Sequence, residues 1–322
     1  MKRTKILVTG ASGFVGSALM NRLAMSPCYE TIVAVRHSFE APAGVTVREI
    51  QSLSKDCDYK DVLSGVDILV HCAARVHVMN ELAVDPLAEF RSVNVEGTLA
   101  LARQAAASGT KRFIFLSSIK VNGEATKAAH PFTTDDKPAP SDPYAVSKFE
   151  AEVELRKIAE ITGMELVIVR PPLIYGPGVK ANFHAMMRWL NRGVVLPFGR
   201  VSNKRSFVAV ANLVDLLCVC LEHPNASNET FLVSDGRDLS TTELLRLMAE
   251  ALGKPARLIP VPVSLMKVIA GLVKRSGVAS RLFDSLQVDI SKAEKLLGWE
   301  PPFSIEDAMK STAQYFQKES LS

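Results

Sequence analysis

One tyrosine in this chain has a lysine four residues after it, and the two side chains could together move a proton. Among the five tyrosines, only Tyr144 has such a neighbour, Lys148. In a helix, residues i and i+4 lie on one face, so the phenol and the ammonium could share a site. A free phenol has a pKa near ~10, and a neighbouring cation lowers that value. We therefore expect Tyr144 to be a general acid or base; the alternative is a pair on a helix surface.

A glycine-rich segment near the N-terminus has the spacing of a phosphate-binding turn. Gly10, Gly13 and Gly16 follow an apolar run that predicts a strand, and they open a helical pattern. Such glycines permit a tight turn, close approach of the backbone to a pyrophosphate, and close packing of helix on strand. The helix N-terminus then faces the phosphates. The segment therefore predicts a dinucleotide site.

The end of the second predicted strand bears on which dinucleotide is bound. In the NAD form of this site, an acidic residue about 20 residues after the glycines grips the ribose 2′-hydroxyl. This chain has Arg36 there, and no carboxylate follows until Glu40. An arginine can bind a 2′-phosphate instead, so NADP(H) is favoured. NAD(H) is the alternative, with Arg36 stacked on the adenine or turned to solvent.

The elements that must hold these residues alternate between strands and helices. Short apolar runs predict strands at 5–9, 31–35, 46–50, 68–72, 112–116, 165–169 and 230–234. Helical patterns cover 15–24, 56–63, 87–108 and 144–161, and further helices are expected near 180–192, 210–222, 240–252 and 304–318. Continuous Val, Ile and Leu runs are typical of parallel strands buried on both faces. The alternation predicts an α/β fold with a Rossmann-type doubly wound parallel sheet.

A change of pattern after residue 171 predicts a second, smaller α/β domain that binds substrate. Prolines and glycines become frequent there, as in the segments 176–178 and 196–199. We assign residues 1–171 and about 205–238 to the dinucleotide-binding domain. Residues 172–204 and about 239–322 form the predicted C-terminal substrate domain.

The composition of the 322 residues argues against several other classes of protein. The net charge of +4 comes from basic residues spread along the chain, whereas a nucleic-acid binder would concentrate them. Five cysteines without CxxC spacing indicate reduced thiols in a cytoplasmic protein. His and acidic residues lack ligand spacing, so no metal site is expected, and His71 is interpreted as a packing or hydrogen-bonding histidine. No run reaches the ~20 apolar residues of a membrane span.

One basic, apolar stretch, 261–281, could contact an acidic membrane surface. We favour a plain surface helix for it.

Six motifs in order give the chain a family resemblance. They are TGASGFVG (9–16), HCAA (71–74), VNVEGT (93–98), LSS (116–118), YAVSK (144–148) and RPPLIYGPG (170–178). In this order the chain resembles the extended short-chain dehydrogenase/reductases, the NAD-dependent epimerase/dehydratase family. The resemblance covers nearly the whole chain. It is specific for the fold and much less so for the substrate, because one fold hosts many chemistries.

The resemblance implies roles for the matched residues. Tyr144 would be the acid/base, Lys148 would lower its pKa and bind the nicotinamide ribose, Ser118 would bond the substrate oxygen, and Asn94 would support the helix bearing the lysine. The implied cofactor residues are Gly10, Ser12, Gly13, Phe14, Val15, Gly16, Arg36, Ser52, Leu53, Cys72, Ala73, Ala74, Ser117, Tyr144, Lys148 and Pro171. The implied substrate residues are Arg75, Ser118, Lys120, Asn182, Phe183, Pro197, Phe198, Arg205 and Arg281. Helices 87–108 and 144–161 would pair in a homodimer.

Three reactions of the family compete. Sugar 4,6-dehydratases carry Asp-Glu where this chain has Ile119-Lys120, so dehydration is disfavoured. Arg36 favours a reductase using NADPH over a 4-epimerase that retains NAD. Two other departures, Ser52 in place of a usual aspartate and Asn122 in place of a usual tyrosine, leave the reaction open.

Segments 76–80, 118–123 and 178–183 resemble a subgroup from bacterial surface-polysaccharide (O-antigen, lipopolysaccharide) biosynthesis. That resemblance implies a 4-ketoreductase that converts a UDP-2-acetamido-2,6-dideoxy-4-hexulose to a UDP-N-acetylquinovosamine-type sugar. The first alternative is a UDP-sugar 4-epimerase acting on UDP-glucose or UDP-N-acetylglucosamine with bound NAD. A non-catalytic NAD(P) sensor is third, disfavoured because Tyr144, Lys148 and Ser118 are all kept.

Overall fold

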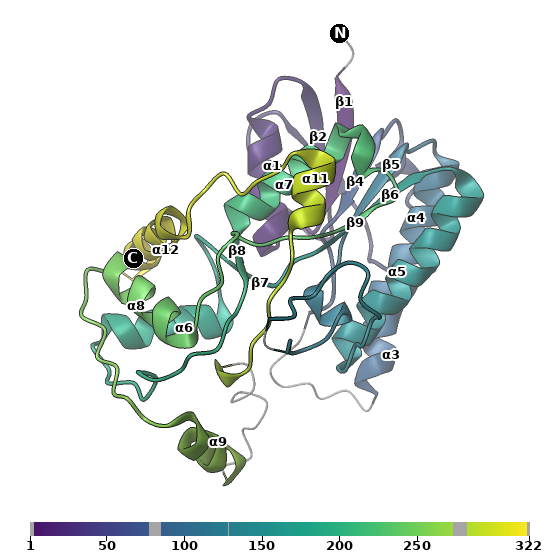
Figure 1. The fold of residues 1–322 in the computed structure, drawn as a ribbon. Coiled ribbons are helices and arrows are strands. Elements are labelled where there is room, and N and C mark those ends of the chain that lie inside the picture. The colour runs from purple at the N-terminus through teal and green to yellow at the C-terminus, as the bar shows by residue number, and fades with distance from the viewer. Residues whose placement is uncertain (1–2, 77–84, 128, 273–281, 321–322) are drawn as a thin grey trace.

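The apolar runs of the sequence form a parallel sheet at the centre of the molecule (Figure 1). The computed structural model describes residues 3–76, 85–127, 129–272 and 282–320. In these residues the sheet has seven strands in the order β3-β2-β1-β4-β5-β6-β9, and every neighbouring pair is parallel. The strands are β1 (Thr4–Thr9), β2 (Tyr29–Val35), β3 (Val45–Glu49), β4 (Ile68–His71), β5 (Arg112–Leu116), β6 (Glu165–Arg170) and β9 (Thr230–Leu232). The predicted doubly wound fold is therefore confirmed.

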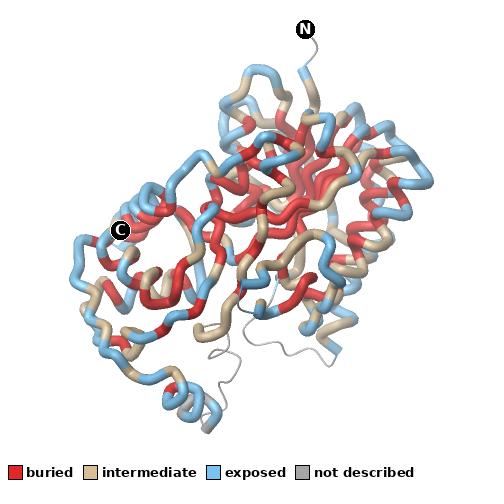
Figure 2. The backbone as a smooth tube through the Cα atoms, in the orientation of Figure 1, coloured by how far each residue is buried: buried red, intermediate tan, exposed pale blue. Residues whose placement is uncertain are grey.

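Helices cover both faces of this sheet, and alternate strand residues contact opposite layers. Ile6 and Val8 pack in the cluster that includes α1 (Phe14–Ala24), α7 (Val210–Glu222) and α11 (Ser291–Leu297). Leu7 packs on the other side, with α2 (Lys60–Leu63), α4 (Thr98–Ala107) and α5 (Pro143–Thr162). Figure 2 shows the resulting buried strands between the two helical layers.

The helix predicted at 87–108 has an irregular turn in its middle. It begins with α3 (Pro86–Arg91), whose first turn is capped by the Asp85 carboxylate accepting from the Ala88 amide at 3.0 Å. A π-helical turn, Ser92–Gly97, then connects α3 to α4. Such turns are rare and frequently occur at functional sites. This one contains Asn94.

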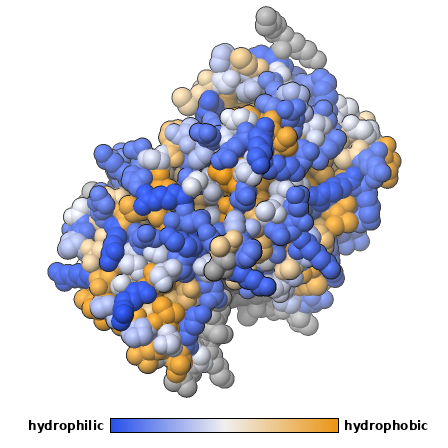
Figure 3. Space-filling view, viewed as in Figure 1, coloured by the Kyte–Doolittle hydropathy of each residue, from blue (hydrophilic) through white to orange (hydrophobic). Residues whose placement is uncertain are grey.

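A second group of helices lies beside the sheet, and we call it the helical lobe. It consists of α6 (Ala181–Asn191), α8 (Thr241–Ala251), α9 (Val263–Leu272) and α12 (Ile305–Glu319). The parallel pair β7 (Leu173–Tyr175) and β8 (Phe207–Ala209) leads into it from the sheet (Figure 1). Its apolar core includes Phe183, Met187, Leu245, Met248 and Met309. Figure 3 shows a mainly hydrophilic face, with hydrophobic side chains gathered over α9 at its lower end.

Candidate functional site

The turn between β1 and α1 is closed so tightly that two of its positions admit only glycine. A Cβ on Gly16 would lie 2.1 Å from the Gly10 carbonyl oxygen, and a Cβ on Gly10 would lie 2.7 Å from the Ala73 nitrogen. Gly10 also has a φ of +75°, which glycine adopts without strain. Gly13 precedes α1 and has no side chain to occupy the amides of its first turn. These amides can donate to an anion, so the turn fits a pyrophosphate.

The other predicted cofactor residues follow the carboxyl ends of six neighbouring strands. Ligands of doubly wound sheets bind outside these ends, near the point where the strand order reverses. Arg36 is exposed directly after β2, and Pro171 is buried directly after β6. The segments after β1, β4 and β5, which lie between these two strands in the sheet, carry Ser12, Phe14, Val15, Cys72, Ala73, Ala74 and Ser117. Ser52 and Leu53 follow β3, on the other side of β2. One sheet edge thus gathers residues that are far apart in the sequence.

Tyr144 and Lys148 lie in the first turns of α5, as the spacing predicts. Pro143 begins this helix, and the Asp142 carboxylate accepts from the Ala145 amide at 2.7 Å. Lys148 is only 2% exposed. Its Nζ donates to the Leu116 carbonyl oxygen at 2.9 Å and lies 4.4 Å from the centre of the Phe115 ring. The ammonium is therefore held at the carboxyl end of β5.

The pKa values of this pair differ from the simple expectation. Burial raises the pKa of Tyr144 to about 12, and the nearby Asp142 carboxylate adds to the rise. We expected the Lys148 cation to lower that pKa, but in the protein alone its ammonium is directed at Leu116 and Phe115. Burial lowers the pKa of Lys148 to about 8, while Cys72 and Glu152 act in the opposite direction. Tyr144 is therefore a proton donor at neutral pH before any ligand binds.

Asn94 connects the π-helical turn to α5, the helix that carries Tyr144 and Lys148. Its amide nitrogen donates to the Ser147 hydroxyl and to the Arg75 carbonyl, each at 3.0 Å, and its oxygen accepts from the Arg75 amide at 2.8 Å. The Ser147 hydroxyl in turn donates to the Tyr144 carbonyl at 2.7 Å. Asn94 therefore fixes the loop after β4 against α5.

The two serines after β5 have different surroundings. Ser117 is buried, and its hydroxyl donates to Glu152 at 2.6 Å. Ser118 is partly exposed, and its oxygen accepts from the Lys120 amide at 3.3 Å. Ser118 therefore keeps a hydroxyl that can reach a ligand, whereas the Ser117 hydroxyl is used inside the protein.

His71 is a buried neutral link, as expected. Its two ring nitrogens lie 2.8 Å from the Thr9 hydroxyl and 2.9 Å from the Thr98 hydroxyl. Burial lowers the pKa of His71 to about 3, so the ring is uncharged at neutral pH. It joins β1, β4 and α4 just below the predicted cofactor edge.

The two predicted substrate cations near Tyr144 have acidic partners. Lys120 forms an ion pair with Asp142, the capping residue of α5. Arg75 lies 3.5 Å from Glu89, and its guanidinium is 5.8 Å from the Phe90 ring centre. Phe90 meets the Tyr144 ring edge to face at 6.1 Å. Arg75, through Phe90, and Lys120, through Asp142, therefore both lie close to Tyr144.

The predicted substrate residues of the second half of the chain have mixed placements. Asn182 is exposed at the start of α6, and Pro197 and Phe198 are half-buried, with Phe198 6.3 Å from the Phe283 ring. Arg205 donates to the Asp284 carbonyl at 2.9 Å. Arg281 lies outside the described residues.

Phe183 does not lie where a ligand could contact it. It is 2% exposed and stacks on Tyr175 with ring centres 5.4 Å apart, inside the core of the helical lobe. Phe183, Met187 and Leu190 share the buried face of α6, so the helix period directs this side chain inward. The prediction of a substrate contact for Phe183 is therefore replaced by a packing role.

Two further residues next to the site, Glu152 and Arg170, were not predicted as site residues from the sequence. They form a buried ion pair with Arg170 Nη2 2.5 Å from Glu152 Oε2, next to Ser117. The spacing of four residues between Tyr144, Lys148 and Glu152 was the available signal, because it places all three on one helix face.

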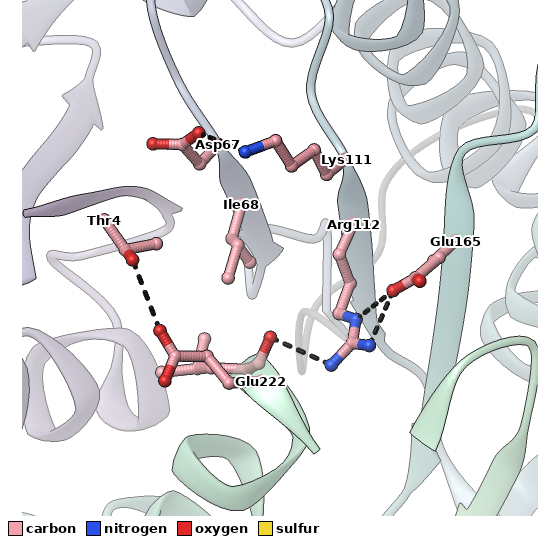
Figure 4. A pocket seen from close by; sticks show the side chains of 8 residues that line it. Thr4, Asp67, Ile68, Lys111, Arg112, Glu165 and Glu222 are labelled. Atoms are coloured by element: carbon pink, nitrogen blue, oxygen red, sulfur yellow. Dashed lines mark hydrogen bonds and ion pairs between the residues drawn. The ribbon is translucent and has the colours of Figure 1, made fainter. Parts of the chain in front are cut away.

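One cavity of about 270 Å³ lies at the opposite, amino edge of the sheet (Figure 4). Its charged side chains pair with one another: Arg112 with Glu165 at 2.6 Å, and Lys111 with Asp67 at 3.0 Å. Arg112 also donates to carbonyls at the end of α7. These contacts close the end of the sheet, and the cavity is far from Tyr144.

Comparison with known proteins fits this geometry. A family model described as the NAD dependent epimerase/dehydratase family matches residues 6–234. The chain belongs to this family. It is 47% identical over 312 residues to a UDP-glucose 4-epimerase of Vibrio cholerae, covering 97% of this chain and 95% of the relative. It is therefore an NAD(P)-dependent nucleotide-sugar enzyme.

Two more distant relatives agree with this assignment. A solved UDP-glucose 4-epimerase of Thermotoga maritima, with UDP-glucose, superimposes with a TM-score of 0.77 at 26% identity, covering 99% of this chain and all of that one. An Escherichia coli O157:H7 N-acetyl-alpha-D-glucosaminyl-diphospho-ditrans,octacis-undecaprenol 4-epimerase is 26% identical over 96% of this chain and 94% of its own length.

Within the described ranges, no cluster of three or more His, Cys, Asp or Glu side chains could hold a metal ion. None of the helices in the same ranges is long and apolar enough to cross a membrane.

Proposed function

We propose that this protein is a UDP-sugar 4-epimerase, with UDP-glucose or UDP-N-acetylglucosamine as its substrate. The observation that carries the proposal is the 47% identity to the Vibrio cholerae UDP-glucose 4-epimerase over nearly the whole length of both chains. The presence of Tyr144, Lys148 and Ser118 around one sheet edge supports it, because the reaction needs a proton donor and acceptor there. Our sequence analysis ranked a 4-ketoreductase first, and the comparisons fit its alternative better.

In this proposal, a bound nicotinamide cofactor would supply the exchange of hydride with C4 of the sugar. Tyr144 takes the proton of the C4 hydroxyl on oxidation and returns it on reduction. Ser118 donates to the same oxygen and holds it near the phenol. Lys148, charged below a pH of about 8, would favour the ionised form of Tyr144 once ligands are bound.

We propose that the helical lobe and the loops next to it hold the nucleotide part of the UDP-sugar substrate. Arg205 and the partly exposed loop with Pro197 and Phe198 would contact the diphosphate and the base. Arg75 lies over Phe90, which contacts the Tyr144 ring, and Lys120 pairs with Asp142, the capping residue of α5. Both would contact the sugar. A homodimer through α3, α4 and α5 remains part of this proposal.

A second candidate keeps the 4-ketoreductase, and Arg36 is the observation that favours it. Arg36 is exposed after β2, where it could bind the 2′-phosphate of NADP(H). A reductase exchanges its cofactor in each cycle, whereas an epimerase keeps it. The nucleotide that co-purifies with the protein therefore separates the two: retained NAD supports the epimerase, and NADP(H) or an empty site supports the reductase.

A paired activity assay tests the proposal. One reaction contains UDP-glucose or UDP-N-acetylglucosamine without added cofactor, and the other contains a UDP-4-keto-6-deoxy-N-acetylhexosamine with NADPH. We expect the C4 isomer in the first reaction. If no isomer forms while NADPH is consumed in the second, the epimerase proposal is wrong and the reductase takes its place.

A further inference from the structure

The face of α5 that carries Tyr144 and Lys148 continues, one turn later, with a buried carboxylate. Glu152 is 0% exposed and follows Lys148 by four residues. Lys148 binds the Leu116 carbonyl at 2.9 Å, and Glu152 accepts from the Ser117 hydroxyl at 2.6 Å. Two side chains one helical turn apart therefore hold two consecutive residues at the end of β5. The next residue is Ser118, whose hydroxyl is open to a ligand.

Glu152 is held in turn by a rigid partner. Arg170, at the end of β6, donates to Glu152 Oε1 at 2.9 Å and to Oε2 at 2.5 Å, and its side chain is 4% exposed. The remaining Arg170 nitrogen donates to the Asn122 side-chain oxygen at 2.9 Å. Asn122 donates to the Thr133 carbonyl at 2.8 Å. The Glu152–Arg170 pair thus connects α5 and β6 to each other and, through Asn122, to Thr133 in the segment that follows Ser118.

We propose that Glu152, fixed by Arg170, is a positioning residue for the proposed reaction. Its carboxylate places the serine loop through Ser117, and its charge helps to keep the buried Lys148 protonated. The expected changes in kcat and KM rest on the proposed function. The effect of Glu152 on Ser117 and Lys148 does not depend on it.

The charges around Lys148 support the second half of this proposal. Cys72 approaches it from the end of β4, and His71 is a neutral ring nearby. Glu152 is the carboxylate from its own helix, and burial makes the cation costly. Replacing Glu152 by glutamine removes that negative charge and leaves Arg170 as an additional buried cation. Both changes disfavour the charged form of Lys148.

The test compares Glu152→Gln with a matched control on the same helix. Glu150 forms a comparable pair with Arg91, at 2.5 and 2.8 Å, but on the exposed side toward α3. In Glu152→Gln we expect kcat to fall at least about tenfold, with KM for the UDP-sugar little changed. The basic limb of the pH–kcat profile should move to lower pH by at least about half a unit. Glu150→Gln should leave the profile in place.

A measurement without substrate separates this inference from the proposed function. Protein labelled with 15N at lysine Nζ is titrated by NMR, and the Lys148 signal is assigned by its loss in Lys148→Met. The Lys148 pKa should be lower in Glu152→Gln than in wild type and Glu150→Gln. If the Lys148 pKa is unchanged in Glu152→Gln, the charge effect of Glu152 is refuted. An inactive wild-type protein would sink the proposed function and still allow this comparison.

A more conservative variant, Glu152→Asp, keeps the proposal testable if Glu152→Gln does not fold. Glu152→Asp keeps the charge but shortens the side chain, so it should lose the Ser117 contact and lower kcat while the basic limb stays. Wild-type kcat in Glu152→Asp would show that the Ser117 contact does not position the serine loop. As a control for a general loss of stability, Glu165→Gln breaks the Arg112 pair at the far edge of the sheet. It should lower the melting temperature and leave the pH profile unchanged.

Discussion

The glycine turn allows a sharp prediction about the cofactor site. In Gly16→Ala, the new Cβ would lie 2.1 Å from the Gly10 carbonyl oxygen, whereas real Cβ atoms essentially never approach within 3.0 Å. The oxygen belongs to the backbone and a Cβ is fixed directly to it, so neither can rotate away and the turn must open by roughly 0.9 Å, the difference between these two distances. A misplacement of about 1 Å can cost an enzyme about 100-fold in rate, and we take a loss of the same size for the binding of the pyrophosphate. We therefore expect cofactor affinity to fall by about two orders of magnitude.

The assay measures cofactor affinity directly. NADH and NADPH fluorescence titrations give Kd for wild type and Gly16→Ala, after any co-purified nucleotide has been removed and quantified. Gly271→Ala, outside the predicted cofactor site, is the control, because a Cβ on Gly271 would meet no atom within 4 Å. It should keep the wild-type affinity. Wild-type affinity in a folded Gly16→Ala protein would refute the assignment of this turn to the pyrophosphate.

Four other predictions follow from single contacts. Tyr144→Phe should lower kcat by about 10²–10⁴-fold with the fold intact, measured by isomer formation and circular dichroism; near-normal turnover would remove Tyr144 from the reaction. Phe183→Ala should lower the free energy of unfolding by about 3–5 kcal/mol in urea, because it empties a buried site; a higher KM at unchanged stability would instead restore the substrate contact. Arg36→Ala should weaken NADP(H) binding about tenfold and spare NAD(H), as removal of one phosphate contact implies; equal effects on both would exclude a 2′-phosphate contact. Burial lowers the pKa of His71 to about 3, so the unfolded chain binds a proton more readily than the folded protein. The free energy of unfolding should therefore fall by about 1.4 kcal/mol per pH unit as the pH drops below about 6.5. His71→Gln should reduce this slope, and an equal slope would assign it to other groups.

Much of the sheet could be predicted because its strands are buried on both faces. The central strands contain continuous apolar runs, and the helices between them keep a helical period. The outer strand β3, with the sequence VTVRE, is the exception and is not buried. The strands β7 (Leu173–Tyr175) and β8 (Phe207–Ala209) were not predicted, because each spans too few residues to show any period. The helix expected at 56–63 is limited to Lys60–Leu63. Before it, the Tyr59 hydroxyl holds the chain by donating to the carbonyls of Ser52 and Ser54.

The site could be predicted less completely, because motifs identify residues and not their partners. The order of motifs led to Tyr144, Lys148, Ser118 and Asn94, and the topology brings their elements together. It gave no sign that Ser117 binds Glu152, since that contact joins two elements across 35 positions. Phe183 was assigned by motif position, although the spacing of Phe183, Met187 and Leu190 already marked a buried helix face.

In the proposed epimerase reaction, C4 of a UDP-sugar is oxidised and then reduced before the sugar leaves the site. UDP-glucose carrying deuterium at C4, incubated with the purified protein without added cofactor and followed by NMR, tests this. We expect the C4 isomer, UDP-galactose, to form with the deuterium kept at C4. Loss of the label from C4 of the isomer, or no isomer from UDP-glucose or UDP-N-acetylglucosamine, would contradict it.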